Sequence, residues 1–188
     1  MTLLLSPVYH IPLSEAQLVL IGRITVVWAQ VDFHLDRILM SLHNIDEEQC
    51  KTFYGRTTIG PKSDAAKIAC SRARSELSRS SIAEMCADIG LCLRDRNLMT
   101  HGMWGYIWDA DIDDWVPGAV SINKREYLPA AELSDLHEKV IRAALSADLA
   151  FYRQVHGQEP PPGYNRSFAS SPFPPEDSSV GPPPIWNS

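Results

Sequence analysis

The clearest pattern in the chain is a run of hydrophobic residues, spaced three and four positions apart, close to its N-terminus. This spacing places the residues in one apolar stripe along a long α-helix. The members are Leu18, Ile21, Ile24, Trp28, Val31, Leu35, Ile38 and Leu42. Ser14 fits the N-cap position, and Gln17 three residues later completes a capping box. We therefore expect a helix from Ser14 to about His43–Asn44, and its single stripe favours a helical bundle or a dimer seam.

Two more helices are expected in the middle of the chain, after a connection with one helical turn near 47–53. The alanine-rich segment 61–77 suits close helix packing and predicts the second main helix. Ser81, with Glu84 three residues later, matches a capping box, so a third helix should start near Ser80–Ser81. Gly102 should end this third helix.

The hydrophobic period changes to two after Gly102. Trp104, Tyr106 and Trp108 alternate with other residues and predict a strand. The acidic segment 109–114 predicts a turn, and a return strand should follow up to residue 122. A last helix is expected after Pro129, with its inner face formed by Leu133, Leu136, Val140, Ala144, Leu145 and Leu149. The pattern therefore predicts an all-α fold of four main helices with a β-hairpin, about 103–122, inserted before the last helix.

Proline placement divides the chain. Nine of the 14 prolines fall between Pro160 and Pro184, in a segment that also contains paired serines. We interpret 156–188 as a flexible, Pro/Ser-rich tail, 14–155 as a single helical domain and 1–13 as an N-terminal extension. The Pro-Pro-Pro-Ile-Trp sequence at 182–186 fits either a docking peptide or an unstructured terminus, and the composition favours the latter.

Composition and charge narrow the class of protein. Of 188 residues, 45% are hydrophobic and 21% charged, which is typical of a folded domain. The net charge of -6 excludes broad electrostatic coating of nucleic acid, although it permits a local basic site. The sequence contains no run of eighteen apolar residues, so it predicts no membrane span. The N-terminus lacks the features of a secretory signal. We expect a cytoplasmic protein that has no membrane partner.

The four cysteines give no sign of a metal site. Cys50, Cys70, Cys86 and Cys92 form no C-x-x-C pair, and no histidine spacing completes a zinc site. The alternating aspartates of 109–114 lack the glycine and the distal glutamate of a calcium loop. We therefore expect a reduced protein with no metal and no cofactor.

Chemically capable side chains gather at the end of the third helix. Arg94, Arg96, Asn97 and His101 lie within eight residues of one another. Arginine offers a fork of donors suited to phosphate, and histidine transfers protons near neutral pH. Together they suit RNA cleavage in which the ribose 2′-hydroxyl is the nucleophile, a reaction that needs no cofactor. On a regular helix, however, Arg96 and His101 lie about 140° apart, so convergence should require fraying at Gly102 or a second subunit.

The sequence Arg96-Asn97-x-x-x-His101 resembles the motif of HEPN domains (higher eukaryotes and prokaryotes nucleotide-binding). In that motif an arginine, usually followed by a polar residue, precedes a histidine by four to six residues. The Trp28-Ala29-Gln30-Val31-Asp32 segment and the His101-Gly102-x-Trp104 run are also similar to a group of small bacterial HEPN-like proteins. The resemblance covers about residues 14–153.

This resemblance implies an all-α up-and-down bundle and a homodimer in which two motif copies face each other across a cleft. Many members of the family are metal-independent endoribonucleases that act as toxins or in defence against phage, so RNA and an antitoxin protein are the implied partners. Arg96 would stabilise phosphate charge, His101 would act as acid or base, and Asn97 would orient His101 or the ribose. Arg94 is a reserve phosphate contact, and Trp104 is a candidate for stacking on a base.

Each of these residues also has a structural interpretation. Arg96 continues the apolar stripe of its helix, so it fits an ion pair with Asp32 of the first helix. Trp104 fits packing against the bundle better than base stacking. Some HEPN-like proteins are non-catalytic dimers that bind partners. An exposed Arg96–His101 pair that faces a cleft favours the nuclease, whereas a buried pair bonded to Asp32 favours the binding protein.

Overall fold

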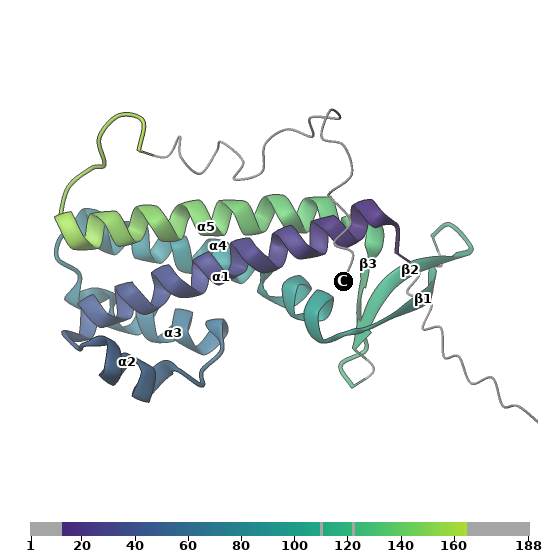
Figure 1. Ribbon diagram of the computed structural model, residues 1–188, viewed down its shortest axis with the longest axis horizontal. Coiled ribbons are helices and arrows are strands. Elements are labelled where there is room, and N and C mark those ends of the chain that lie inside the picture. The colour runs from purple at the N-terminus through teal and green to yellow at the C-terminus, as the bar shows by residue number, and fades with distance from the viewer. Residues whose placement is uncertain (1–12, 110, 122, 165–188) are drawn as a thin grey trace, which may run out of the picture.

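The computed structural model describes residues 13–109, 111–121 and 123–164, which form five α-helices and a small antiparallel sheet (Figure 1). The elements are α1 (Glu15–His43), α2 (Glu47–Tyr54), α3 (Ile59–Ala69), α4 (Glu76–His101), β1 (Met103–Asp109), β2 (Asp114–Ser121), β3 (Glu126–Pro129) and α5 (Leu133–His156). Short 3-10 turns at Cys70–Arg72 and Ala130–Glu132 precede α4 and α5. The predicted helical fold with a hairpin before the last helix is confirmed.

The long helix α5 packs against both α1 and α4, and α4 runs opposite to the other two (Figure 1). Ser41 near the end of α1 accepts a hydrogen bond from Gln154 near the end of α5, so these two helices are parallel. The predicted stripe of α1 is buried from Ile24 onward, whereas Leu18 is 48% exposed and Ile21 is only partly buried. His34 and Leu39, which the stripe did not include, are buried with it. The shorter α3 packs on α1 and α4.

Both predicted ends of α1 are confirmed. The Ser14 hydroxyl accepts a hydrogen bond from the Gln17 backbone N–H, and the Gln17 side chain accepts one from the Ser14 N–H. At the other end, Asn44 adopts a left-handed conformation with φ of 53°, which asparagine tolerates better than most residues. The expected helical turn after α1 is also present, as the eight-residue α2.

The predicted boundary between the second and third helices is wrong. The second helix, α3, ends at Ala69 instead of residue 77, because the chain passes through a 3-10 turn and becomes extended at Ala73. The third helix, α4, starts at Glu76 with Ser75 as its N-cap, where the Ser75 hydroxyl accepts from the Ser78 N–H. Ser81 is not a cap but a buried residue inside α4.

The sheet has one more strand than the sequence predicted. β1 and β2 form the expected antiparallel hairpin, in which Trp104 lies opposite Ala119 and Trp108 opposite Trp115. β3 pairs antiparallel with the other side of β2. At the base of this sheet, Ala119 and the opposing Leu128 are buried against the helices. β3 has only four residues, too few to show the alternation of apolar and polar residues that predicts a strand.

The structure describes the first residues after α5, as far as Tyr164, and these belong to the predicted tail. α5 ends at His156, where the predicted tail begins. The Tyr164 hydroxyl donates a hydrogen bond to Asp148 (3.3 Å), and the Tyr164 ring lies 4.5 Å from that of Tyr152, so this segment lies back along α5. The rest of the predicted tail and most of the N-terminal extension lie outside the described residues.

Among the described helices, α1 is long and apolar enough to cross a membrane by length and composition alone. A helix buried in a protein core passes the same test, and α1 contributes buried residues from Ile24 to Leu42 to the core.

Candidate functional site

The residues of the HEPN-like motif lie on the last two turns of α4. The helix remains regular through His101, and the Gly102 N–H donates to the Leu98 carbonyl (2.8 Å). A Cβ atom on Gly102 would collide with that carbonyl oxygen and crowd Ala119 of β2. Glycine is therefore needed at the sharp change from α4 to β1, which holds the end of the helix against the sheet.

A pocket of about 830 Å³ opens beside this end of α4. Its walls come from α1, the start of α3, the end of α4 and the connection between β2 and β3. The lining residues with polar or charged side chains are Thr25, Asp32, Thr58, Arg94, Arg96, Asn97, His101, Ser121, Lys124 and Glu126, together with the indole of Trp28. The structure thus brings together five residues that the sequence proposed for the site, which are Arg94, Arg96, Asn97, His101 and Asp32.

The Arg96 guanidinium lies over a tryptophan. Its carbon Cζ is 5.3 Å from the centre of the Trp28 ring, within the range of a cation–π interaction. Nη1 donates a long hydrogen bond (3.4 Å) to Oδ1 of Asn97, while the buried Nε has no partner among the described residues. Burial lowers the pKa of Arg96, and the charge of Asp32 opposes that shift. Arginine remains charged under these conditions, so the pocket contains a positive charge on an aromatic base.

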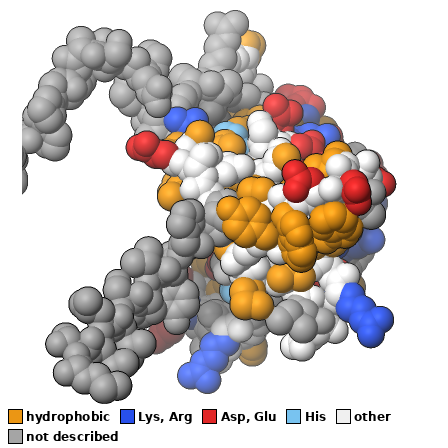
Figure 2. Space-filling model, turned by 90° about the vertical axis from the view of Figure 1, so that its right-hand side faces the viewer, with side chains coloured by type: hydrophobic (Ala, Val, Ile, Leu, Met, Phe, Trp, Pro, Cys, Tyr) orange, Lys and Arg blue, Asp and Glu red, His pale blue; other side chains and the backbone are white. Residues whose placement is uncertain are grey.

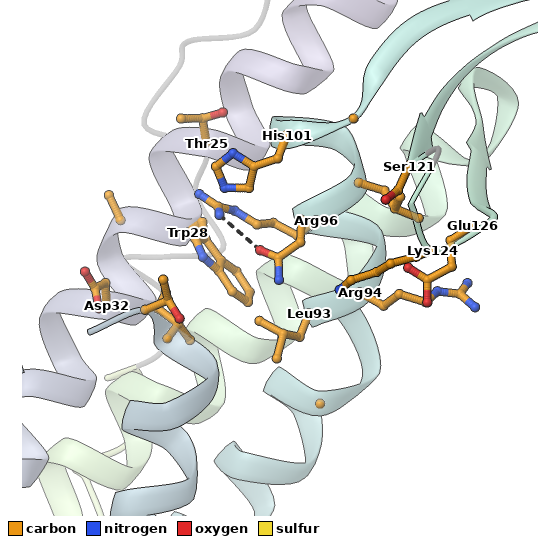
Figure 3. A pocket seen from close by; sticks show the side chains of 17 residues that line it. Thr25, Trp28, Asp32, Leu93, Arg94, Arg96, His101, Ser121, Lys124 and Glu126 are labelled. Atoms are coloured by element: carbon orange, nitrogen blue, oxygen red, sulfur yellow. Dashed lines mark hydrogen bonds between the residues drawn. The ribbon is translucent and has the colours of Figure 1, made fainter. Parts of the chain in front are cut away.

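His101 is exposed and faces the same pocket. Figure 3 shows its imidazole and the Arg96 guanidinium directed to the same side of α4, towards α1. The expectation that the pair converges only through fraying or a second subunit is therefore wrong, because α4 is intact and both residues line one pocket. The angle of about 140° applies to the bonds that leave the helix, and the long arginine side chain bends across it.

The predicted ion pair between Asp32 and Arg96 is also wrong. Asp32 instead accepts a hydrogen bond from the ammonium of Lys62 on α3 (2.8 Å), and the same ammonium lies 2.7 Å from Asp36. Burial lowers the pKa of Lys62, but the hydrogen bonds and charges of the two aspartates outweigh it and raise the pKa overall. Two carboxylates four residues apart on α1 therefore share one buried ammonium.

Arg94 lies at the rim of the pocket and is well exposed. Its guanidinium pairs with the adjacent Asp95 (2.7 Å), whose hydrogen bond and charge raise the pKa of Arg94. Figure 3 shows its side chain near Lys124 and Glu126 of the sheet. Its position fits the predicted role of a reserve contact at the edge of the site.

Trp104 is a predicted substrate contact that the structure does not bring to the pocket. Its indole N–H donates to the Met99 carbonyl (3.1 Å), and its ring packs on the core. Trp104 therefore anchors β1 to the end of α4, in agreement with the packing alternative.

Trp28 and Lys124 are among the pocket residues that the sequence did not assign to the site. Trp28 belongs to the buried stripe of α1, and nothing in its spacing distinguished it from a core residue. Lys124 lies in the connection between β2 and β3, so its place in the site depends on a strand that was not predicted. The HEPN-like segment 28–32 contained Trp28, but only the structure shows that its ring lies under Arg96.

The charge of the pocket differs from that of the chain. Three basic side chains, Arg94, Arg96 and Lys124, line it against two acidic ones, Asp32 and Glu126. Lys62 is shared by Asp32 and Asp36, and Arg94 is paired with Asp95. The positive charge available to an anionic ligand therefore rests on Arg96 and Lys124, with Glu126 beside them.

Other chemistry has less support in the described residues. No three His, Cys, Asp or Glu side chains among them are grouped to hold a metal ion. Burial raises the pKa of the Cys92 thiol to about 12, which disfavours the thiolate that a cysteine nucleophile requires.

Comparison with family models, with curated proteins and with solved structures finds no match to this chain.

Proposed function

We propose that this chain is a HEPN-type, metal-independent endoribonuclease that acts as a homodimer. In this proposal α1, α3, α4 and α5 form the bundle. Because α1 and α5 are parallel, the helices do not follow the up-and-down order that the resemblance implied. The observation that carries the proposal is that Arg96, Asn97 and His101 line one open pocket at the end of a regular helix. The absence of an Arg96–Asp32 ion pair in the described structure also favours the nuclease over a buried structural pair.

The reaction follows from the chemistry of these groups. The ribose 2′-oxygen attacks phosphorus while the bond to the 5′-oxygen breaks, which leaves a 2′,3′-cyclic phosphate and a 5′-hydroxyl. One proton leaves the 2′-hydroxyl and one reaches the 5′-oxygen, so two acid–base groups are useful. His101 supplies one, and His101 of the partner subunit supplies the other. Arg96 stabilises the charge that develops on the phosphoryl oxygens, and Asn97 orients the arginine through its side-chain oxygen.

The exposed side of α1 supports the dimer. Val19, Val26 and Phe33 are about half exposed and recur every seven residues, which places them on one line along the helix. Thr25 and Ala29 lie between them in sequence and belong to the wall of the pocket. A two-fold contact through this face would bring the pockets of the two subunits together, so that one RNA strand could contact both pockets.

Substrate recognition would rest on phosphate charge. Arg94 and Lys124 extend the positive region beyond Arg96, in positions suited to phosphates that flank the cleaved bond. A toxin or a phage-defence component, restrained by an antitoxin protein, is the biological role that this activity best fits.

Purified protein incubated with mixed RNA in EDTA tests the proposal. Wild type should cleave, and the products should end in 2′,3′-cyclic phosphate. His101→Ala and Arg96→Ala should each lose at least about a hundredfold in rate, since positioned acid–base and electrostatic groups contribute that much. His156→Ala, an exposed histidine at the end of α5, and Arg37→Ala, an arginine of α1 outside the pocket, are the matched controls and should cleave like wild type.

If all five proteins are folded and behave alike, the enzyme proposal is lost. The non-catalytic alternative, a dimer that binds a partner, would then account for the pocket. The stacking of Arg96 on Trp28 is the observation in its favour, because a cation on an aromatic ring also stabilises packing.

A further inference from the structure

The β1–β2 hairpin carries aromatic side chains that remain about half exposed. Tyr106, Trp108 and Trp115 are 61%, 49% and 59% exposed, and we call them the hairpin aromatic patch. Trp108 and Trp115 are opposite each other, with ring centres 5.7 Å apart, and Tyr106 lies two residues along the same face. Figure 2 shows hydrophobic side chains gathered at this end of the molecule, with acidic side chains beside them.

The patch continues a face that is buried at its base. Along this face of the hairpin, the pair Trp108–Trp115 is followed by Tyr106–Pro117 and then by Trp104–Ala119. This last pair lies at the base and packs on the helices. Because side chains alternate along a strand, the base and the tip of this face belong to one continuous apolar surface. The helices bury only the base of this face. The aromatic side chains at the tip are removed from solvent only if another segment packs on them.

We propose that residues 1–12 of this chain pack on the hairpin aromatic patch. This segment contains Met1, Leu3, Leu4, Leu5, Val8, Tyr9 and Ile11, and it has no Asp, Glu, Lys or Arg. It therefore combines the apolar content needed to cover the patch with the absence of charge that burial requires. This inference does not depend on the proposed ribonuclease activity.

The attachment point of the segment lies at the correct end of the molecule. α1 begins at the end that carries the sheet (Figure 1), and Leu13 packs on the same core as Trp104. Twelve extended residues reach about 40 Å. The four residues from Trp104 to Trp108 span only about 13 Å of strand, so the whole patch is within range.

Charge and position disfavour the other occupants. Asp113 and Asp114 are exposed beside the patch and would repel the phosphates of RNA. The C-terminal segment 165–188 contains Glu176 and Asp177, and the described chain approaches it from the middle of α5, through Tyr164. A neutral segment that leaves α1 at the sheet meets neither obstacle.

Fluorine NMR of protein that contains 5-fluorotryptophan tests this packing. The resonances of Trp108 and Trp115 are assigned by single Trp→Phe variants, and their broadening by a soluble paramagnetic agent reports exposure. Removal of residues 2–12 should shift both resonances and increase their broadening about twofold or more, whereas the buried Trp28 should not change. Removal of 165–188 is the matched control and should leave both resonances in place.

Unchanged resonances after removal of 2–12 would overturn the proposal. A shift caused instead by removal of 165–188, or by dilution of the full chain, would also overturn it, in favour of the tail or of a second copy. A reciprocal measurement does not depend on the truncated protein. Chymotrypsin should cut within residues 1–12 several times faster in Trp108→Ala/Trp115→Ala than in wild type or in Phe53→Ala, which removes an exposed ring from α2. Equal rates in all three would count against the packing.

Discussion

At the scale of single residues, the arrangement of Lys62 shows how exposure decides the cost of losing a partner. The Lys62 side chain is 4% exposed, whereas those of Asp32 and Asp36 are 44% and 35% exposed. If Lys62 is replaced, water can hydrate the two carboxylates. If the two aspartates are replaced, a charged ammonium is left inside the protein.

We therefore predict an asymmetric loss of stability. Asp32→Asn/Asp36→Asn should reduce the free energy of unfolding by about 3–5 kcal/mol, because it strands a buried charge. Lys62→Met should reduce it by clearly less, because methionine fills the same space. Urea unfolding of both variants measures the difference, and an equal loss in the two would show that exposure of the carboxylates does not matter here.

A second residue-scale prediction concerns pH. Burial lowers the pKa of His34, and the nearby charge of Asp148 opposes the shift. Because the folded-state pKa lies below that of the unfolded chain, the unfolded chain binds the proton more readily. The contribution of His34 to stability is therefore complete above about pH 6.5 and is lost as the pH falls through the folded-state pKa.

His34→Gln should accordingly flatten the fall in the free energy of unfolding between about pH 7 and about pH 5. Burial raises the pKa of Asp148, so its contribution is lost as the pH rises and acts in the opposite direction. The Tyr164 hydroxyl, which donates to Asp148, has a pKa raised to about 12 by burial and does not titrate in this range. Urea titrations across the range, with the exposed His156→Gln as control, measure the effect, and parallel curves for wild type and His34→Gln would contradict it.

The candidate site shows what sequence can predict at this scale. Arg94, Arg96, Asn97 and His101 were identifiable because chemically capable residue types are clustered at a helix end that glycine terminates. Their convergence was not, because helical angles describe where a side chain begins and not where a long one ends. Trp28 could not be recognised either, since a buried aromatic in a core stripe has the same spacing whether or not a cation lies on it.

At the scale of elements, the ends of helices were predicted well where one strong signal acted alone. Ser14 with Gln17 and the change from α4 to β1 at Gly102 are of this kind. The start of α4 was misplaced because two serine signals compete. Ser81 has a glutamate three residues later, whereas Ser75 has the N–H of Ser78 to bind, and tertiary packing selects Ser75 by burying Ser78 and Ser81 against α5.

This competition gives a test of the α4 cap. Ser75→Ala should reduce the free energy of unfolding by about 1 kcal/mol, since it leaves an N-terminal N–H group without its acceptor. Ser80→Ala, at an exposed position inside α4, should change stability by a few tenths of a kcal/mol or less, because alanine favours helix. Thermal or urea unfolding compares the two, and an equal or larger loss for Ser80→Ala would contradict the assignment of Ser75 as the cap.

At the scale of the whole molecule, α1 connects the site to the proposed dimer. Its buried stripe builds the core, its Trp28 and Thr25 line the pocket, and the line of Val19, Val26 and Phe33 is apolar and exposed. An apolar line on a helix surface is stabilised when a partner covers it. Helices α3 and α5 cover two sides, and among the described residues nothing covers the line through Val26 and Phe33.

The dimer is therefore tested on that line. Val26→Glu/Phe33→Glu should convert a wild-type dimer to a monomer, because a two-fold contact brings each carboxylate close to its own copy in an apolar interface. Ile68→Glu, at a highly exposed position on α3, is the matched control and should leave the mass unchanged. Light scattering coupled to size exclusion measures the mass. RNA cleavage by the same variants then separates the two roles of α1. A monomer that cleaves at the wild-type rate would mean that one pocket suffices, and a wild-type protein that is monomeric at all concentrations would remove the dimer from the proposal.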